Sequence, residues 1–262
     1  MKTKSIFLLF LLIAFSGCVK EEDETGIPLT AGYTTISGHI VTSGNTPLRG
    51  VKLQVTYIET LYLASYHSWL KKEATTDDKG NYSMSFNIKD NEVESYKKHD
   101  GQFNSYFQLL FDFNNLNPDK YFLSYYSVDN DYSFFVDPVL KQDTSYSISC
   151  YIPAKDHITV NLNNFKPEQE NDCFEVETFF PWGIKSEKKD NSNKFLNTGY
   201  GISSSGYDNF VAKNENQVFR VPVARNDTNI VRIIKVKNGI ASPEDHKIFV
   251  PENNDIELTY EY

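Results

Sequence analysis

Strict alternation of apolar and polar residues dominates the chain from Tyr33 to its C-terminus. Successive side chains of a β-strand point to opposite faces, so this pattern predicts strands with one buried and one solvated face. A helical period is nearly absent, and only 91–100 and 65–72 are candidates for short helices. The apolar positions of the first block are Ile36, Gly38, Ile40, Val51, Leu53, Val55, Tyr57, Tyr82, Met84, Phe86, Ile88, Phe107, Leu109, Phe111, Phe113, Tyr146, Ile148, Cys150 and Ile152.

A second block of alternation runs from His157 to the end of the chain. We predict an all-β protein with two antiparallel β-sandwich domains in tandem, at 33–155 and 156–262, joined at 153–156. The sequence of the second domain resembles no family. Its apolar positions are Ile158, Val160, Leu162, Phe174, Val176, Phe219, Val221, Val223, Ile256, Leu258, Tyr260 and Tyr262.

The first 17 residues have the order of a secretory signal peptide. Lys2 and Lys4 precede an apolar run at 6–15, and Ser16 and Gly17 supply small residues beside a cleavage site. The run is too short to span a bilayer as a helix, which needs about 20 residues. We therefore expect cleavage after 1–17, with an uncleaved membrane anchor as the alternative.

The four residues Phe15-Ser16-Gly17-Cys18 resemble the bacterial lipoprotein box. The resemblance implies that Cys18 becomes the first mature residue and carries acyl chains, so outer-membrane lipid is an expected partner. The acidic run at 21–24 looks like a tag for the outer face of the outer membrane. The alternatives are a plain solvated tether and a protein that faces the periplasm. We interpret 18–32 as a flexible acidic linker.

The charge balance argues against nucleic acid as a partner. The chain has 26 basic and 35 acidic residues, and loss of Lys2 and Lys4 with the signal peptide leaves 24 basic residues and a net charge of −11. Phosphate recognition depends on clusters of Lys and Arg, which this sequence lacks.

Two motifs in the first block resemble the carboxypeptidase regulatory-like family. They are "TISGHIVTSGNTPLRGVKLQV", which starts at Thr35, and "ATTDDKGNYSMSF", which starts at Ala74. The resemblance implies a transthyretin-like β-sandwich at 33–155 with insertions, and a scaffold without catalytic residues of its own. The residues that match are Gly38, Ile40, Pro47, Leu48, Gly50, Val51, Thr76, Asp77, Gly80 and Tyr82.

No residue pattern predicts catalysis, a cofactor or a metal site. The five histidines lack the spacing of metal ligands. The segment 201–205 lacks the last Gly of a nucleophile elbow and is interpreted as part of a flexible loop. Asp129 and Asp131 have oxygen ligands suited to calcium but lack the Gly and Glu of an EF-hand loop. The pair Glu175 and Glu177 is interpreted as the solvated side of a strand. We expect a protein that is not an enzyme.

Cys150 and Cys173 allow two interpretations, a disulfide or two separate thiols. An oxidising compartment permits the bond. Cys150, however, shares an apolar face, whereas Cys173 alternates with two glutamates, so the two side chains are expected on different kinds of surface.

Two groups of aromatic residues are candidates for ligand binding. Tyr121 and Tyr125 lie on one face of an aromatic run, opposite Phe122. Trp182, Tyr200 and Tyr207 lie near glycines in loops, where flat rings can stack against sugars.

These groups support two hypotheses. The first is a lipid-anchored cell-envelope protein for interaction or structure, as an adhesin or as an accessory subunit of a surface complex. The second is a glycan-binding surface lipoprotein. The competing interpretation is that these aromatic residues fill cores and a contact between domains.

Overall fold

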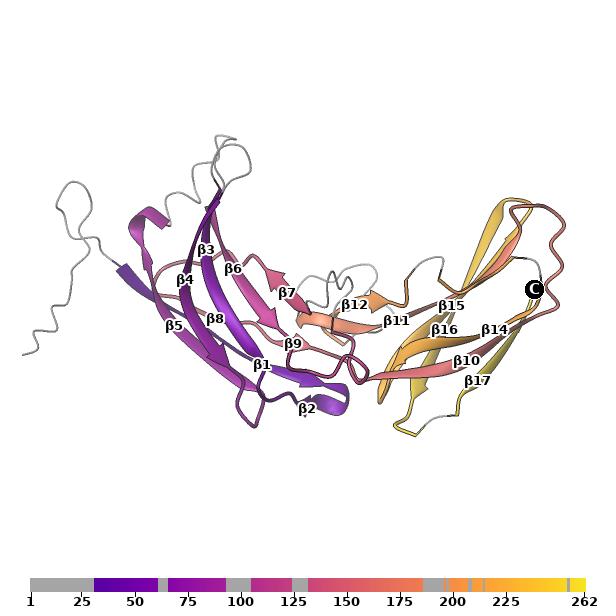
Figure 1. Ribbon diagram of the computed structural model, residues 1–262, viewed down its shortest axis with the longest axis horizontal. Coiled ribbons are helices and arrows are strands. Elements are labelled where there is room, and N and C mark those ends of the chain that lie inside the picture. Colours follow the sequence, from indigo (N-terminus) through magenta and orange to yellow (C-terminus); the bar gives the residue numbers. More distant parts are fainter. Residues whose placement is uncertain are drawn as a thin grey trace, which may run out of the picture.

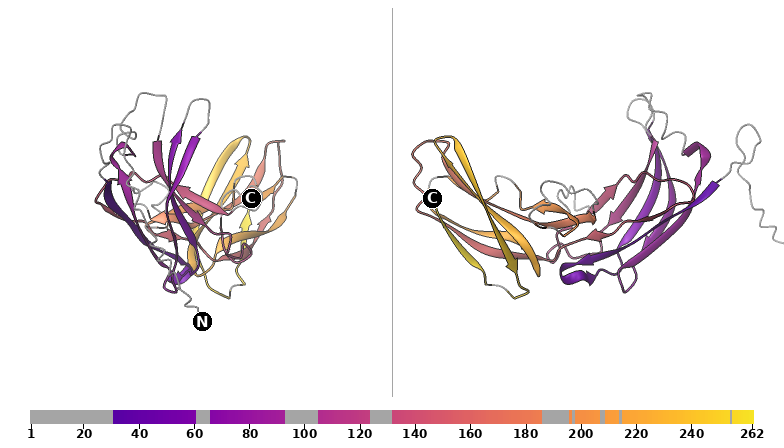
Figure 2. Two further views of the ribbon diagram at one scale, coloured as in Figure 1. Left: turned by 60° about the vertical axis from the view of Figure 1, so that its left-hand side comes forward. Right: turned by 180° about the vertical axis from the view of Figure 1, so that it is seen from behind.

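The structure is a computed structural model, and it describes residues 31–60, 66–92, 105–123, 132–185, 196, 198–206, 209–213, 215–253 and 255–262. Strands make up almost all of its regular structure, so the predicted all-β class is confirmed. Figure 1 shows two β-rich halves side by side along the long axis, with β9, β11 and β12 between them. The same arrangement is seen from behind in Figure 2.

Alternating segments of the sequence form the strands. Those of the first half are β1 (Ala31–Thr42), β2 (Thr46–Pro47), β3 (Lys52–Thr60), β4 (Tyr66–Thr75), β5 (Asn81–Lys89), β6 (Ser105–Asp112), β7 (Ser133–Val136), β8 (Ser145–Ser147) and β9 (Cys150–Tyr151). A short 3₁₀ helix, η1 (Ser43–Asn45), joins β1 to β2. The later strands are β10 (Lys155–Asn163), β11 (Cys173–Lys185), β12 (Tyr200–Ser204), β13 (Val211–Ala212), β14 (Gln217–Ala224), β15 (Asp227–Lys237), β16 (Ile240–Val250) and β17 (Glu257–Glu261).

The strands form three sheets. A ten-stranded sheet has the order β16-β15-β11-β9-β1-β2, with β12 and β13 paired to β11 and with β5 and β8 paired to β1. Two smaller sheets have the orders β4-β3-β6-β7 and β14-β10-β17. Most pairs are antiparallel, as predicted, but β1 pairs in parallel with β8 and β9, and β10 pairs in parallel with β17. No hairpin joins these parallel pairs, because a two-residue turn can connect only antiparallel neighbours.

Most inward positions of both alternating blocks are buried as predicted, and others are half-buried against the same cores: Tyr146, Ile148, Phe219, Ile256, Leu258, Tyr260 and Tyr262. In the first half, the sheet β4-β3-β6-β7 packs its apolar face on β1, β5, β8 and β9 around one core, which includes Ile36, Leu53, Met84, Phe111 and Ile152. A second core lies between β10, β14 and β17 on one side and β11 and β15 on the other. Its buried residues are Ile158, Val160, Leu162, Phe165, Phe174, Val176, Ala212, Val221, Val223, Val231, Ile233 and Val250.

The two motifs of the first half meet in space, and Thr76 joins them. Its hydroxyl donates to the carbonyl oxygen of Leu48 (2.7 Å) and accepts from the amide of Val51 (3.0 Å). Gly80 has a φ of 73° and approaches β1 so closely that a Cβ would lie 2.5 Å from the carbonyl oxygen of Ile40. A side chain would therefore clash there, besides being strained at positive φ.

The turn after Thr76 is closed by Asp77. Its carboxylate accepts from the amides of Lys79 (2.9 Å) and Asn81 (2.8 Å). These hydrogen bonds, chiefly that from Asn81, lower the pKa of Asp77. The Asp-rich turn predicted from "TTDDKGNY" is therefore present.

Strand β11 belongs to both halves. Its residues 173–179 pair with β15, whereas Gly183 and Ile184 pair with Tyr151 and Cys150 of β9. The change of partner coincides with a register irregularity in the pairing of β11 with β12, between Pro181 and Lys185. Gly183, within this interval, has a φ of 88°. Trp182 and Ile184 then pack against the first core, although the predicted boundary at 155/156 placed them with the second block.

The expected short helix at 65–72 is wrong for its described part, because 66–72 belong to β4. β4 is an edge strand, and its pairing with β3 has a register irregularity opposite Val55 and Thr56. Its sequence therefore lacks the clean period of two that would have predicted a strand. Of 91–100, only the first two residues are described, and they complete a helical turn at 90–92.

We predict that Thr76→Val lowers the free energy of unfolding by about 1–3 kcal/mol, because it leaves a buried carbonyl and a buried amide without their partner. Denaturant unfolding of the variant measures this loss. Thr46→Val is the matched control, since Thr46 is exposed. A loss no larger than that of the control would contradict the bridging role of Thr76.

Candidate functional site

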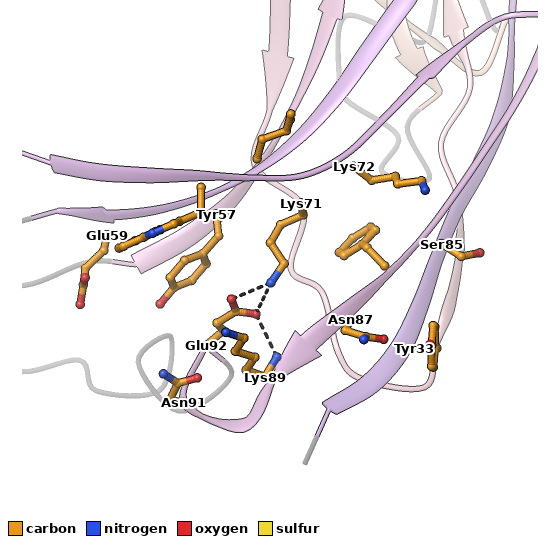
Figure 3. A pocket seen from close by; sticks show the side chains of 13 residues that line it. Tyr33, Tyr57, Glu59, Lys71, Lys72, Ser85, Asn87, Lys89, Asn91 and Glu92 are labelled. Atoms are coloured by element: carbon orange, nitrogen blue, oxygen red, sulfur yellow. Dashed lines mark hydrogen bonds and ion pairs between the residues drawn. The ribbon is translucent and has the colours of Figure 1, made fainter. Parts of the chain in front are cut away.

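A groove of about 860 Å³ lies at the side of the first half, between the edge strands β4 and β5 (Figure 3). The strands that border it, β4 and β5, lie on the side of the first half that faces away from the second half (Figure 1). We call it the lateral groove. Its lining residues are Tyr33, Tyr57, Glu59, Trp69, Leu70, Lys71, Lys72, Ser85, Phe86, Asn87, Lys89, Asn91 and Glu92.

A β-bulge in β4 brings two consecutive lysines to this groove. Val55 of β3 is paired with Lys72 and Thr56 with Leu70, so Lys71 is the extra residue. At a bulge the alternation of faces is interrupted, which re-aims a side chain. Lys71 and Lys72 therefore both line the groove, although regular alternation would place them on opposite faces.

Lys71 and Glu92 form a nearly buried ion pair inside the groove (Figure 3). The Nζ atom of Lys71 lies 2.7 and 2.9 Å from the two carboxylate oxygens of Glu92. The side chains are only 13% and 9% exposed. Glu92 also accepts from the backbone amide of Lys89 (2.9 Å), which holds the helical turn that follows β5. The pair fixes β4 to the end of β5, since each charge would be costly to bury alone.

Two exposed aromatic side chains line the groove, Tyr33 of β1 (67% exposed) and Trp69 of β4. The indole of Trp69 is 46% exposed, and it is paired across the strands with Tyr57, at 5.8 Å between ring centroids. Its neighbours Leu70 and Tyr66 are 56% and 65% exposed. Large apolar side chains that gather at the end of an edge strand are typical of an interaction surface.

The sequence predictions missed this groove. The signal was present in "YHSWLKK", where aromatic and apolar residues stand without a clear period beside two lysines. The groove depends on the bulge and on the approach of β4 to β5, and neither is visible in the local pattern.

Trp182, a predicted ligand-binding residue, is used for packing between the halves. Its Nε1 donates to the carbonyl oxygen of Phe122 (2.7 Å), and its ring meets Phe134 edge to face at 4.8 Å. Phe122 in turn stacks on Phe180 at 4.2 Å. The indole that was expected in a loop is therefore half-buried in a strand.

The predicted aromatic stripe has the wrong phase in its described part. Leu123 is buried and Tyr121 is half-buried against the first core, whereas Phe122 packs toward β11. Tyr121 also forms an isolated bridge with Ala154. The segment is therefore part of the connection between the halves. Tyr125, like Tyr207 and Cys18, lies outside the described residues.

Tyr200 lines a second cavity, of about 300 Å³, where the halves meet. Its ring lies 5.0 Å from that of Tyr151, whose hydroxyl donates to the carboxylate of Asp227. Burial raises the pKa of Asp227 and also those of Tyr151 and Tyr200. Both tyrosines are therefore uncharged at neutral pH, and the Tyr151–Asp227 bond joins β9 to the start of β15.

Cys150 and Cys173 are free thiols, so the disulfide alternative is wrong. Ile184 is paired with Cys150, and Cys173 stands eleven residues before it on the same strand. At about 3.3 Å per residue, that separation is far too large for a disulfide. Burial raises the pKa of Cys150, which keeps it a protonated core residue.

Two further interpretations from the sequence are corrected. Glu175 and Glu177 are 3% and 6% exposed, so they do not lie on a solvated face. The reason is that β11 is a central strand, with neighbours along both edges and a covered outer face. Ser203, in the segment interpreted as a flexible loop, belongs to β12 and is buried.

Among the described residues, no three or more His, Cys, Asp and Glu side chains are grouped so that they could hold a metal ion. The same part of the chain has no helix long and apolar enough to cross a membrane.

No protein-family model matches this chain, and a search of curated proteins found no match. Among solved structures, the shaft pilin SpaA from Lactobacillus rhamnosus GG has a TM-score of 0.26 and 13% identity, over 88% of this chain and 98% of the pilin. The major pilin SpaD from Corynebacterium diphtheriae has a TM-score of 0.28 and 11% identity, over 83% and 64% of the two chains. A 9R-lipoxygenase from Cyanothece has a TM-score of 0.25 and 13% identity, over 53% and 18%. Likenesses with TM-scores this low do not establish a family or a role for this chain.

We predict that Glu92→Gln lowers the free energy of unfolding by about 2–4 kcal/mol, because it leaves the ammonium of Lys71 nearly buried without its counter-charge. The matched control is Asp78→Asn, which breaks the ion pair of Asp78 with Arg49. These two side chains are 78% and 75% exposed, and the loss should stay below about 1 kcal/mol. Equal losses in denaturant unfolding would contradict the structural role of the Lys71–Glu92 pair.

Proposed function

We propose that this protein is a lipid-anchored interaction or structural protein of the cell envelope without catalytic activity. Acyl chains on Cys18 hold it at the outer membrane, and the linker 18–32 joins the anchor to the β-body. The body presents the lateral groove as its binding surface, as an adhesin or as an accessory subunit of a surface complex.

The observation that carries this proposal is the chemistry of the lateral groove. It combines the exposed Trp69 with polar side chains and with the edges of β4 and β5, which pair with no other strand of the described residues there; this combination suits binding. One lysine and one glutamate of its lining, Lys71 and Glu92, neutralise each other. A catalytic carboxylate or amine must be placed so that it can transfer a proton or attack a substrate. The paired charges instead stabilise the wall of the groove.

The position of the groove also fits an anchored protein. The tether would end at β1 (Ala31–Thr42), and Tyr33 of that strand lines the groove. The permanence of the anchor follows from acyl chains, each of which contributes about 0.8 kcal/mol per buried methylene.

The glycan-binding hypothesis is weakened for its predicted residues, because Trp182 and Tyr121 pack between elements and Tyr200 lines a small cavity. Polysaccharide binding would therefore use other exposed rings, such as Tyr33 and Trp69 of the lateral groove. The likeness of the first half to the carboxypeptidase regulatory-like family stays a prediction, as does the division into domains at 155/156.

We predict that Cys18→Ala abolishes metabolic labelling with palmitate and moves the protein from the membrane fraction to the soluble periplasmic or culture fraction. The reason is that the thiol is the site of acylation and the β-body has no other proposed anchor. Labelling followed by cell fractionation measures both effects.

Cys173→Ala is the matched control, because this half-buried thiol lies in β11 and has no proposed lipid. It should keep full labelling. Retention of label in Cys18→Ala would contradict the anchor. Protease treatment of intact cells then separates display at the cell surface from a periplasmic position.

A further inference from the structure

We infer that the lateral groove accepts an extended peptide segment of another protein, which adds as a strand to the free edge of β4. This inference rests on the proposed binding role of the groove. It names the class of partner and the side-chain pattern that the partner must carry.

One edge of β4 is open. Among the described residues, β4 pairs with β3 alone and β5 pairs with β1 alone, so the groove lies between two strand edges. An edge strand presents unpaired backbone amides and carbonyls, which are a template for another strand. Strand addition uses such an edge for affinity and side-chain contacts for specificity.

The edge of β4 contrasts with that of β16, an edge strand of similar length. The middle of β16 carries Pro243, Glu244, Asp245 and Lys247, and Arg232 of β15 binds Asp245 through two hydrogen bonds of 2.7 and 2.9 Å. Proline and charges of this kind protect an edge against pairing. In β4 the five residues 66–70 contain no proline, acid, lysine or arginine, although all five are exposed. That half of β4 lacks the usual protection.

The lining of the groove is positively charged, in contrast to the chain as a whole, which has a net charge of −9. The net charge of the lining is +1, from the charged residues Glu59, Lys71, Lys72, Lys89 and Glu92. Lys71 is neutralised by Glu92. Lys72 forms no ion pair with any described residue. The groove is therefore complementary to a segment that carries a carboxylate.

The bulge fixes the spacing that the segment must have. Trp69 is paired with Tyr57 and Lys72 with Val55, and these two partners stand two positions apart on β3. A regular strand placed alongside β4 would therefore meet Trp69 and Lys72 as two neighbouring side chains on one face, two of its own positions apart. Cross-strand neighbours lie about 4.5–5.5 Å apart. The matching segment has an apolar residue and an acidic residue two positions apart.

The test uses the mature chain, with Cys18→Ser for solubility, to select from displayed random peptides of 12 residues. We expect enrichment of an apolar residue and an acid separated by one residue. A synthetic copy of an enriched peptide should protect the amides of β4 from hydrogen exchange. Its affinity should fall at least tenfold with Lys72→Glu, with Trp69→Ala, and with N-methylation of alternate peptide amides.

Two control substitutions on β16, Lys247→Glu and Phe249→Ala, should leave the affinity unchanged. Lys72→Glu changes a surface charge, so its effect separates binding from folding, and circular dichroism checks the fold of each variant. The inference is overturned by the absence of enriched peptides, by binding that survives N-methylation, or by unprotected β4 amides.

It is also overturned if the groove has another occupant. One such result is retardation on a polysaccharide gel that Trp69→Ala abolishes, and the other is a dimer that Trp69→Ala dissociates. Failure of these peptide measurements alone would leave the Cys18 labelling result, and thus the proposed anchor, untouched.

Discussion

The backbone pairing of one strand, β11, is the constraint on which the rest of the structure depends. Its first seven residues hydrogen-bond to β15 in the second half, and its end hydrogen-bonds to β9 in the first. Pro181 has no amide to donate, and it stands beyond Phe179, the last residue paired with β15. Gly183, at positive φ, lets the strand turn toward β9. One sheet therefore contributes strands to the walls of both cores.

Side-chain contacts around β11 reinforce this continuity. Trp182 and Phe180 bind the segment around Phe122, and Tyr151 reaches across to Asp227. Three of the aromatic residues that sequence reasoning assigned to ligands, Tyr121, Trp182 and Tyr200, thus lie where the halves join. The strands β4 and β5, which border the lateral groove, lie at the opposite side of the first half (Figure 1), and the groove's lining includes none of these junction residues.

The sequence predicted what depends on local periodicity. The buried positions of β1, β3, β5 and β6 follow from alternation alone, and the Asp77 turn follows from its residue types. It did not predict features that depend on contacts between distant strands. The burial of Glu175 depends on the central place of β11, and the phase of Tyr121 depends on its bridge to Ala154. The groove depends on an extra residue, Lys71, whose effect appears only when β4 is paired with β3.

The two cores form one cooperative unit, because neither can open without breaking the pairing of β11. Hydrogen exchange of the full mature chain, measured at increasing denaturant concentration, tests this directly. Amides of β3, in the first core, and of β15, in the second, should lose protection together in a single transition. Loss of protection in one of these strands while the other stays protected would contradict the account.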